Sequence, residues 1–153
     1  MVKGLRILGE GLALGLRPYR DVLLFRGRAT RSETFLFLML AGTIGSAIAM
    51  LAARLGLTVG LTDAQMLATL PIMTLAARRL HDIGLPGWPG PLIAATVMIL
   101  RISYDSPLQV PVAAEATRWL SLIALFAIIF WPPAPGENRY GPDPRLVPEG
   151  AAS

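Results

Sequence analysis

Apolar segments separated by short polar stretches make up most of this chain. Residues 34–53 contain no charged side chain, and a helix needs about 20 such residues to cross the hydrocarbon of a bilayer. Three further apolar segments are shorter: 64–77, 89–102 and 118–131. Pro71 lies inside the first of these three and should kink it, which membrane helices tolerate. The pattern predicts an all-α membrane protein with four transmembrane helices.

The residues before the first span follow a two-sided pattern instead. Leucines recur at helical spacing between charged positions, at Leu5, Leu8, Leu12 and Leu16. This spacing predicts an amphipathic interfacial helix over residues 1–20. A cleavable signal peptide is the alternative, but Glu10 interrupts its apolar stretch and no small-residue cleavage site follows. At the start of the first span, Thr30 or Ser32 is expected to cap the helix.

Two polar stretches are expected to lie outside the spans. Residues 103–117 include two prolines and two acidic residues, which predicts a loop before the fourth span. Residues 134–153 are rich in proline and glycine and too polar to cross a membrane, which predicts an irregular C-terminal tail. The expected parts are a cytoplasmic N-terminal segment, a four-helix transmembrane domain and a cytoplasmic tail, at residues 1–33, 34–133 and 134–153.

Composition supports the membrane location and excludes several kinds of metal site. The chain is 54% hydrophobic and 16% charged, whereas soluble domains carry about 25% charged residues. It has no cysteine and one histidine, which excludes thiolate and multi-histidine metal sites, and no metal or other cofactor is expected. Four spans place three of the 14 cations, Arg54, Arg101 and Arg118, on one side and the other eleven on the side of the termini. This asymmetry predicts cytoplasmic termini and explains the net charge of +4 without a nucleic-acid partner.

Three polar motifs lie next to predicted helix ends on the side of the termini. The central motif, residues 78–82 (Arg-Arg-Leu-His-Asp), closes the second span, and Gly84 is its candidate C-cap. The other two motifs precede the first span and follow the fourth. Neighbouring helices pack about 8–10 Å apart, so the three motifs should form one contiguous cluster. Its candidate residues are Arg28, Arg31, Glu33, Arg78, Arg79, His81, Asp82, Asn138, Arg139, Tyr140 and Asp143.

The main interpretation of this cluster is a structural clasp, in which arginine forks pair with carboxylates and fix the helix ends and the tail. The expected pairs are Asp82 or Glu33 with an arginine of residues 26–31, and Asp143 with Arg78 or Arg79. The alternative is an anion site for anionic lipid or a phosphorylated metabolite, because several arginines would lie at headgroup depth.

Other classes of function have weaker support in the sequence. A membrane enzyme would use His81 as a general base with Asp82 or Asp143, but no nucleophile stands out, and no residue is assigned as catalytic. A small transporter is disfavoured because no Asp, Glu or Lys lies in the middle of a span. An accessory subunit or assembly factor of a larger membrane complex is a further alternative. Its apolar helix faces would contact other membrane proteins or a second copy.

The same three motifs resemble those of a known family. Residues 25–33 resemble its F-x-G-R-x-x-R-x-E opening, residues 78–88 its R-R-L-H-D … S-G-W signature, and residues 136–144 its G-x-N-x-Y-G-x-D-P ending. By these motifs, in this order, the chain resembles the YhaH-like family of small inner-membrane proteins of unknown function. Pro86 departs from the usual serine, and residues 34–35 depart from the usual Tyr-Trp. The resemblance implies a four-helix protein of the bacterial inner (plasma) membrane and no particular reaction.

Overall fold

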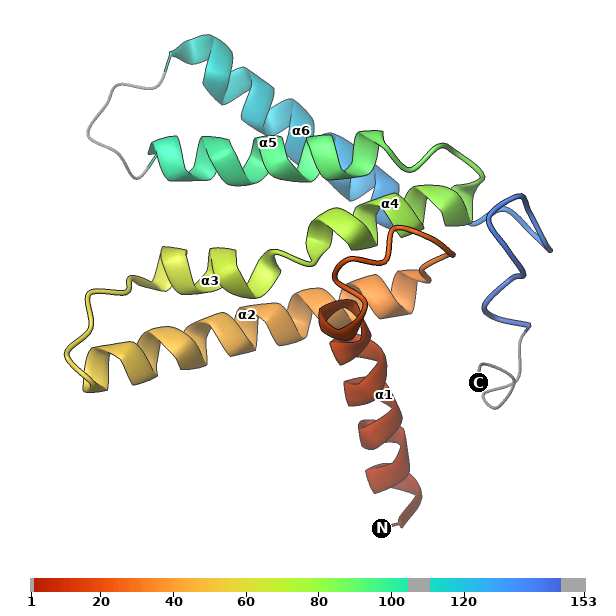
Figure 1. Ribbon diagram of the computed structural model, residues 1–153, viewed down its shortest axis with the longest axis horizontal. Helices are drawn as coiled ribbons and strands as arrows, with labels where there is room; N and C mark the ends of the chain where they lie inside the picture. The colour runs from red at the N-terminus through yellow and green to blue at the C-terminus, as the bar shows by residue number, and fades with distance from the viewer. Residues whose placement is uncertain (1, 105–110, 147–153) are drawn as a thin grey trace.

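The protein is built almost entirely of helices. Its computed structural model describes residues 2–104 and 111–146, and these residues contain six helices and no β-strand (Figure 1). The helices are α1 (Val2–Arg20), α2 (Arg31–Arg54), α3 (Leu61–Thr69), α4 (Ile72–Ile83), α5 (Pro89–Tyr104) and α6 (Val112–Phe130). The predicted all-α class is therefore confirmed. Two helices, α2 and α6, are long and apolar enough to cross a membrane, and α5 is a shorter apolar helix, so helix length alone does not establish four spans.

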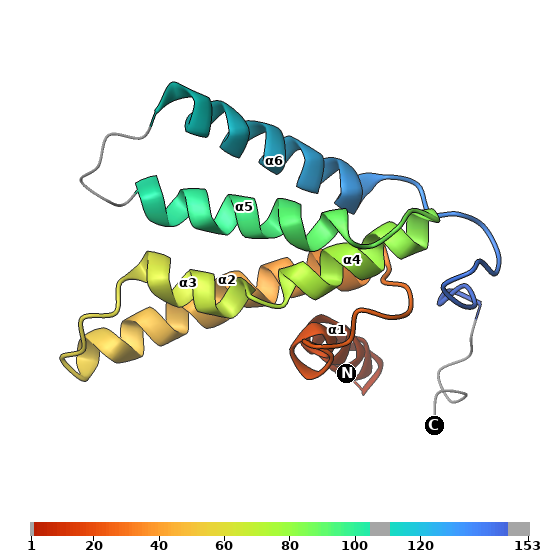
Figure 2. The ribbon, with the colours of Figure 1, turned by 45° about the horizontal axis from the view of Figure 1, so that its top comes forward.

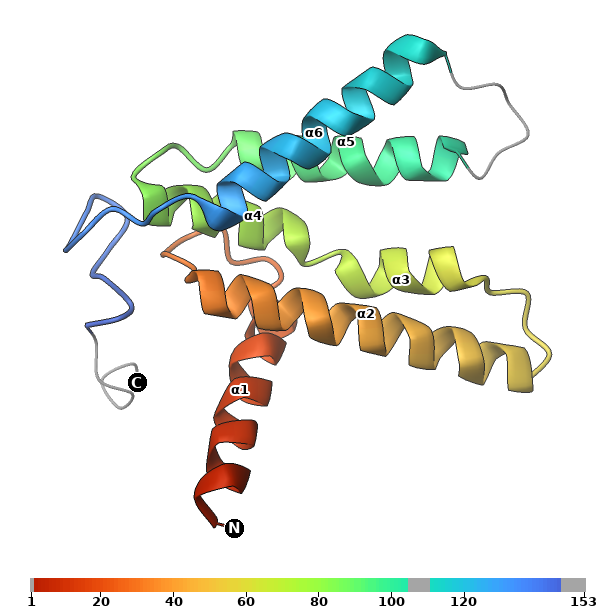
Figure 3. The same ribbon diagram turned by 180° about the vertical axis from the view of Figure 1, so that it is seen from behind.

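Two helix pairs joined through α4 form the body of the molecule. Helix α2 packs along α3, α5 packs against α6, and α4 contacts both α5 and α6. The start of α2, the end of α4 and the end of α6 come together at one end of this body, beside the tail (Figures 1 and 3). Helix α1 packs on α2 but projects away from the body instead of following its long direction (Figures 1 and 2).

The predicted second span consists of two helices instead of one kinked helix. Helix α3 ends at Thr69, and α4 begins directly after Pro71, whose ring nitrogen has no hydrogen to donate. The carbonyl of Ala68, at the end of α3, accepts a hydrogen bond from the Tyr19 hydroxyl of α1 at 2.6 Å. Helix-end carbonyls lack intrahelical partners, so α1 supplies a donor at this break.

The loop expected at residues 103–117 is also shorter than predicted, because α6 begins at Val112 directly after Pro111. Glu115 lies in the first turn of α6 and pairs with Arg118 at 2.5 Å, which favours helix over loop here. Residues 105–110 of the expected loop lie outside the described residues. In the tail, residues 134–146 contain no helix.

Glycines let neighbouring helices approach closely at two places. An added Cβ atom on Gly45 of α2 would lie 2.7 Å from the Cα atom of Gln65 in α3. An added Cβ atom on Gly90 of α5 would lie 2.7 Å from the backbone nitrogen of Ala77 in α4. The core around these contacts includes Phe37, Ala41, Ala68, Ile72 and Leu75. Such close approach supplies the packing contacts that hold helices together in lipid.

The helix ends near the polar motifs have the caps that the sequence predicts. Thr30 Oγ1 accepts the backbone N–H of Glu33 at 3.1 Å. Gly84 ends α4 in the left-handed conformation, with a φ of 91°, and the N–H of Leu85 returns to the carbonyl of Leu80. These caps set the directions in which the loop before α2 and the turn after α4 leave their helices.

Candidate functional site

A buried carboxylate, Asp82 of α4, lies where three parts of the chain meet. Its side chain is 0% exposed, and guanidinium groups from the loop before α2, from α4 and from the tail surround it. Arg28 Nε lies 2.9 Å from Oδ1, and Arg79 Nη1 lies 2.5 Å from Oδ2. Arg145 Nη2 lies 2.8 Å and 2.6 Å from the two carboxylate oxygens. These four residues are called the Asp82 cluster below.

Arg28 connects this cluster to the backbone of the tail. Its Nη1 and Nη2 atoms donate to the carbonyls of Gly136 at 2.5 Å and Ala134 at 2.7 Å. The N–H of Ala134 in turn donates to the backbone carbonyl of Asp82 at 2.8 Å. Hydrogen bonds from charged groups are about twice as strong as neutral ones, so the tail is firmly attached to the end of α4.

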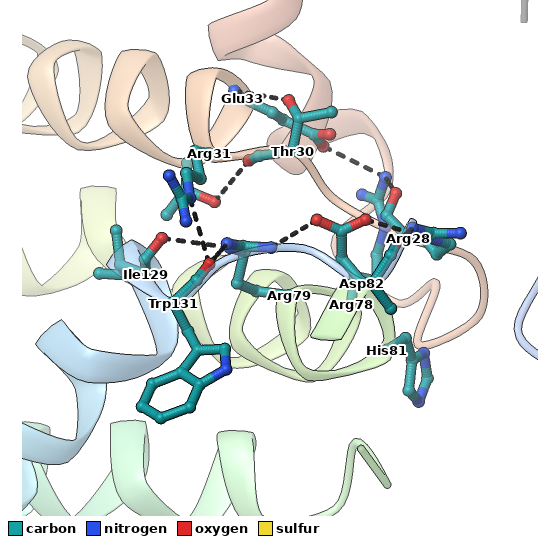
Figure 4. A network of polar contacts seen from close by, with 12 residues as sticks. Arg28, Thr30, Arg31, Glu33, Arg78, Arg79, His81, Asp82, Ile129 and Trp131 are labelled. Carbon is teal, nitrogen blue, oxygen red and sulfur yellow. Dashed lines mark hydrogen bonds and ion pairs between the residues drawn. The ribbon is translucent and has the colours of Figure 1, made fainter. Parts of the chain in front are cut away.

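Arg79 and Arg31 bind the end of α6. Arg79 Nε donates to the carbonyl of Ile129 at 3.2 Å, and its Nη2 donates to the carbonyl of Trp131. The Trp131 carbonyl also accepts Arg31 Nε at 3.1 Å (Figure 4). The last carbonyls of a helix have no intrahelical partner, and the two arginines satisfy them here.

A second charged group, the Glu33 cluster, ties α1 to α2 and α4. Arg78 of α4 is buried, 3.2 Å from Glu33 and 3.8 Å from Asp21. Arg17 of α1 lies 3.3 Å from Asp21 and 4.0 Å from Glu33. Neither Glu33 Oε1 nor Arg78 Nε has a hydrogen-bond partner among the described residues. This cluster is therefore held by looser ion pairs than the Asp82 cluster.

His81 is enclosed by the backbone and the tail. Its Nδ1 atom lies 3.0 Å from the Gly27 carbonyl, which can only accept, so Nδ1 carries the proton. The ring stacks on Tyr140, with centroids 3.8 Å apart, and Nε2 faces Gly87, where an added Cβ atom would lie 2.5 Å away. Burial lowers the pKa of His81, which favours the neutral imidazole. The Asn138 amide donates to the His81 carbonyl at 2.9 Å.

The structure brings the three motifs together, with pairs that agree in part with those expected. The expected pair of Asp82 with an arginine of residues 26–31 is present, and Arg28 is that arginine. Glu33 pairs instead with Arg78, because the side chain of Arg78 points to the α1 side of α4 and that of Arg79 to the α6 side.

The expected pair of Asp143 with Arg78 or Arg79 is wrong. The Asp143 carboxylate accepts the backbone N–H of Arg145 at 3.0 Å and its Nη1 atom at 3.0 Å. A local turn therefore satisfies Asp143 and directs the rest of the Arg145 guanidinium to Asp82. The spacing of Asp143 and Arg145 was a signal for this pair in the sequence. An arginine two residues after an aspartate can contact that aspartate and still reach a second carboxylate, here Asp82.

Arg139, like Arg31, is a member of the predicted set that stays at the surface. It is exposed, and its guanidinium lies over the ring of Tyr140 at 4.7 Å. Sequence reasoning also missed Arg17 and Asp21. Their spacing of four residues, which pairs side chains on one helix face, was the available signal.

These features define a class: a small helical membrane protein with buried ion clusters at one end of its helices. A family model described as "Protein of unknown function (DUF805)" matches residues 22–142, and the chain belongs to this family. The match includes all three polar motifs up to residue 142, and it agrees with the resemblance found in the sequence. Two relatives, each named "Inner membrane protein YhaI", come from Escherichia coli strain K12 and Escherichia coli O157:H7. Each is 31% identical over 124 residues, which cover 80% of this chain and 86% of the relative. No solved structure matches the chain.

Proposed function

We propose that this protein is a non-enzymatic inner-membrane protein that crosses the bilayer four times with both termini in the cytoplasm. The spans would be α2, α3 together with α4 as far as Ala77, α5, and α6, which leaves residues 78–83 at the end of α4 outside the hydrocarbon. The inner-membrane relatives support the location, and the length and apolar character of α2 and α6 support two of the spans. The direction of α1, away from the body, suits an interfacial helix whose exposed leucines enter the membrane surface.

The proposed role of the Asp82 cluster is a structural clasp. The observation that carries it is one fully buried carboxylate bound by three guanidinium groups from three separate segments. Most donors of Arg28 and Arg79 are directed at acceptors within the chain, which favours a clasp over an anion site at these two residues. The clasp would present the helix ends and the tail to the cytoplasm as one fixed surface.

The surroundings of His81 support a non-enzymatic role. A general base must reach the proton that it removes, directly or through one water molecule. Here one ring nitrogen is used by the Gly27 carbonyl, Tyr140 covers a ring face, and Gly87 lies against the other nitrogen. This arrangement favours a histidine that holds the tail in place.

The absence of cysteine from the chain makes the topology directly testable. Single-cysteine variants Thr58→Cys, Pro86→Cys and Glu137→Cys would be treated with a membrane-impermeant thiol reagent on intact spheroplasts. Four spans expose only the cysteine at position 58, between α2 and α3, until the cells are lysed. If α2 and α6 alone crossed, the turn at Pro86 would lie outside. Labelling of Pro86→Cys in intact spheroplasts would therefore refute the proposed topology.

A second candidate function, as an accessory subunit or assembly factor, is favoured by the surface of α6. Five of its large apolar residues are half to two-thirds exposed: Trp119, Leu120, Ile123, Phe126 and Phe130. Lipid or the helix of a partner would cover this face. Purification in mild detergent would distinguish the two, because a stable partner subunit would co-purify in a fixed ratio and lipid alone would not.

A further inference from the structure

Two positively charged groups share a single neutral acceptor at the seam between α2 and α6. The Trp131 carbonyl accepts both Arg31 Nε, at 3.1 Å, and Arg79 Nη2 (Figure 4). The pKa of Arg79 is lowered, and burial is the largest cause. Asp82 raises this pKa, whereas the nearby charges of Arg31 and Arg145 lower it further. The like charges repel each other, and a nearby anion would relieve the repulsion.

The carboxylates of the Asp82 cluster and of its neighbour Asp143 do not balance the charge of the arginines around them. Arg28, Arg31, Arg79 and Arg145 contribute four positive charges, and Asp82 and Asp143 contribute two negative charges. Arg28 and Arg79 are buried and bonded on all sides, so they cannot take an external anion. Arg31 is exposed, and its Nη1 and Nη2 atoms have no acceptor within residues 2–104 and 111–146.

Three exposed aromatic residues belong to the two helix ends that meet at Arg31. Phe35, one turn further along α2, is 51% exposed, and Phe130 and Trp131 at the end of α6 are 50% and 58% exposed. Helices α2 and α6 meet here, and aromatic rings are enriched at the membrane–water interface. The Nε contact holds the guanidinium in place, and the two free Nη atoms have the fork geometry that binds two oxygens of one phosphate.

We propose that Arg31 is the headgroup site for one anionic phospholipid on the cytoplasmic leaflet. The headgroup phosphate would accept from Nη1 and Nη2 of Arg31, and the acyl chains would lie along the rings of Phe35 and Phe130. The excess positive charge selects a headgroup with net negative charge over a zwitterionic one. This inference rests on the proposed topology, which places Arg31 at the depth of the cytoplasmic headgroups.

Lipid selectivity of the full-length protein tests the proposal. The protein would be reconstituted in phosphatidylcholine vesicles, and electron paramagnetic resonance would compare its association with spin-labelled phosphatidylglycerol and spin-labelled phosphatidylcholine. We expect the wild type to prefer phosphatidylglycerol and Arg31→Gln to lower that preference about fivefold, the effect of one basic residue at an anionic surface. The matched control is Arg26→Gln, which removes an equal charge at an exposed position five residues away, and it should keep the preference.

Three outcomes would overturn the site. These are an unchanged preference in Arg31→Gln, an equal loss in Arg26→Gln, or displacement of the labelled lipid by soluble glycerol phosphate, which has the headgroup without the chains. If Arg31→Gln lowers the melting temperature, the lipid preference of Arg31→Lys tests the site instead. It keeps the charge but lacks the paired donors, so it should have an intermediate preference, and a wild-type preference would refute the fork contact. Failure of the topology is detected separately, by the labelling of Pro86→Cys.

Discussion

Replacing Asp82 by asparagine should destabilise the protein more than a single substitution of any tail residue or of any other residue that contacts the tail. The substitution keeps the size of the side chain and removes the charge that three guanidinium groups share. Arg28 and Arg79 would stay buried, with only neutral carbonyls as acceptors. Removing one partner of a buried ion pair typically costs about 3–5 kcal/mol, because the charge left behind has no counter-ion.

The matched control for this prediction is Asp143→Asn. Its partner Arg145 is 35% exposed, and ion pairs that reach solvent contribute only about 0–1 kcal/mol. For a chain of this size, 1 kcal/mol corresponds to a change in melting temperature of roughly 2–4 °C. We therefore expect Asp82→Asn to melt roughly 6–20 °C below the wild type and Asp143→Asn only a few degrees below it.

The assay is thermal unfolding of the purified protein in mild detergent, followed by size-exclusion chromatography with fluorescence detection. A double variant, Arg28→Gln with Asp82→Asn, tests the reasoning further. It removes both partners, so its loss should be well below the sum of the two single losses. Equal melting temperatures for Asp82→Asn and Asp143→Asn, or additive losses in the double variant, would refute the clasp.

Three further predictions follow from single contacts. Burial lowers the pKa of His81 from its usual 6.5, so the folded chain binds fewer protons than the unfolded chain and loses stability as pH falls through about 6.5. His81→Asn should fold normally and lack this slope in melting temperature against pH, and an unchanged slope would contradict it. Gly90→Ala should lower the melting temperature by crowding α4, whereas Gly42→Ala, with nothing within 4 Å of the added Cβ atom, should leave it unchanged or raise it. Tyr19→Phe should cost about 1 kcal/mol in thermal unfolding, because it leaves the Ala68 carbonyl without its donor, and a neutral result would show that another group replaces the hydroxyl.

The sequence predicts the helices well where one strong signal acts alone. The uncharged segment of residues 34–53 has the length of a span, and the structure has α2 there. Prediction is weaker where two signals compete. Pro71 is expected to kink one helix, and the structure has two helices there, α3 and α4, with the Tyr19 hydroxyl from a distant part of the chain bonded to the Ala68 carbonyl at the break. Such a long-range contact leaves no periodic pattern in the sequence.

The candidate site was predictable in part of its members and less so in its pairs, because Arg17, Asp21 and Arg145 lie outside the predicted motifs. Charge type and position next to helix ends were enough to place Arg28 and Asp82 in one cluster. Asp143 pairs with Arg145, two residues away, and not with a distant arginine, because a local turn forms there. Which acceptors Arg31 and Arg79 would find could not be read from the sequence, since both use a backbone carbonyl. Every residue has such a carbonyl, and its availability depends on where a helix ends.

The position of the charged clusters explains why buried ions are useful in this fold. In a water-soluble core, a buried ion pair can often be replaced by apolar residues without loss of stability. Between lipid-facing helices, apolar contacts specify the relative height of the helices poorly, because lipid tails are as apolar as the side chains. A slide of α4 along its neighbours by one turn, about 5.4 Å, would break the contacts of Asp82 with Arg28 and Arg145 and those of Arg79 with the end of α6. The proposed clasp would therefore fix the register of α2, α4 and α6 at one end. In the proposed topology, Arg31 would lie at the edge of that surface, with its two outer nitrogen atoms directed to the bilayer.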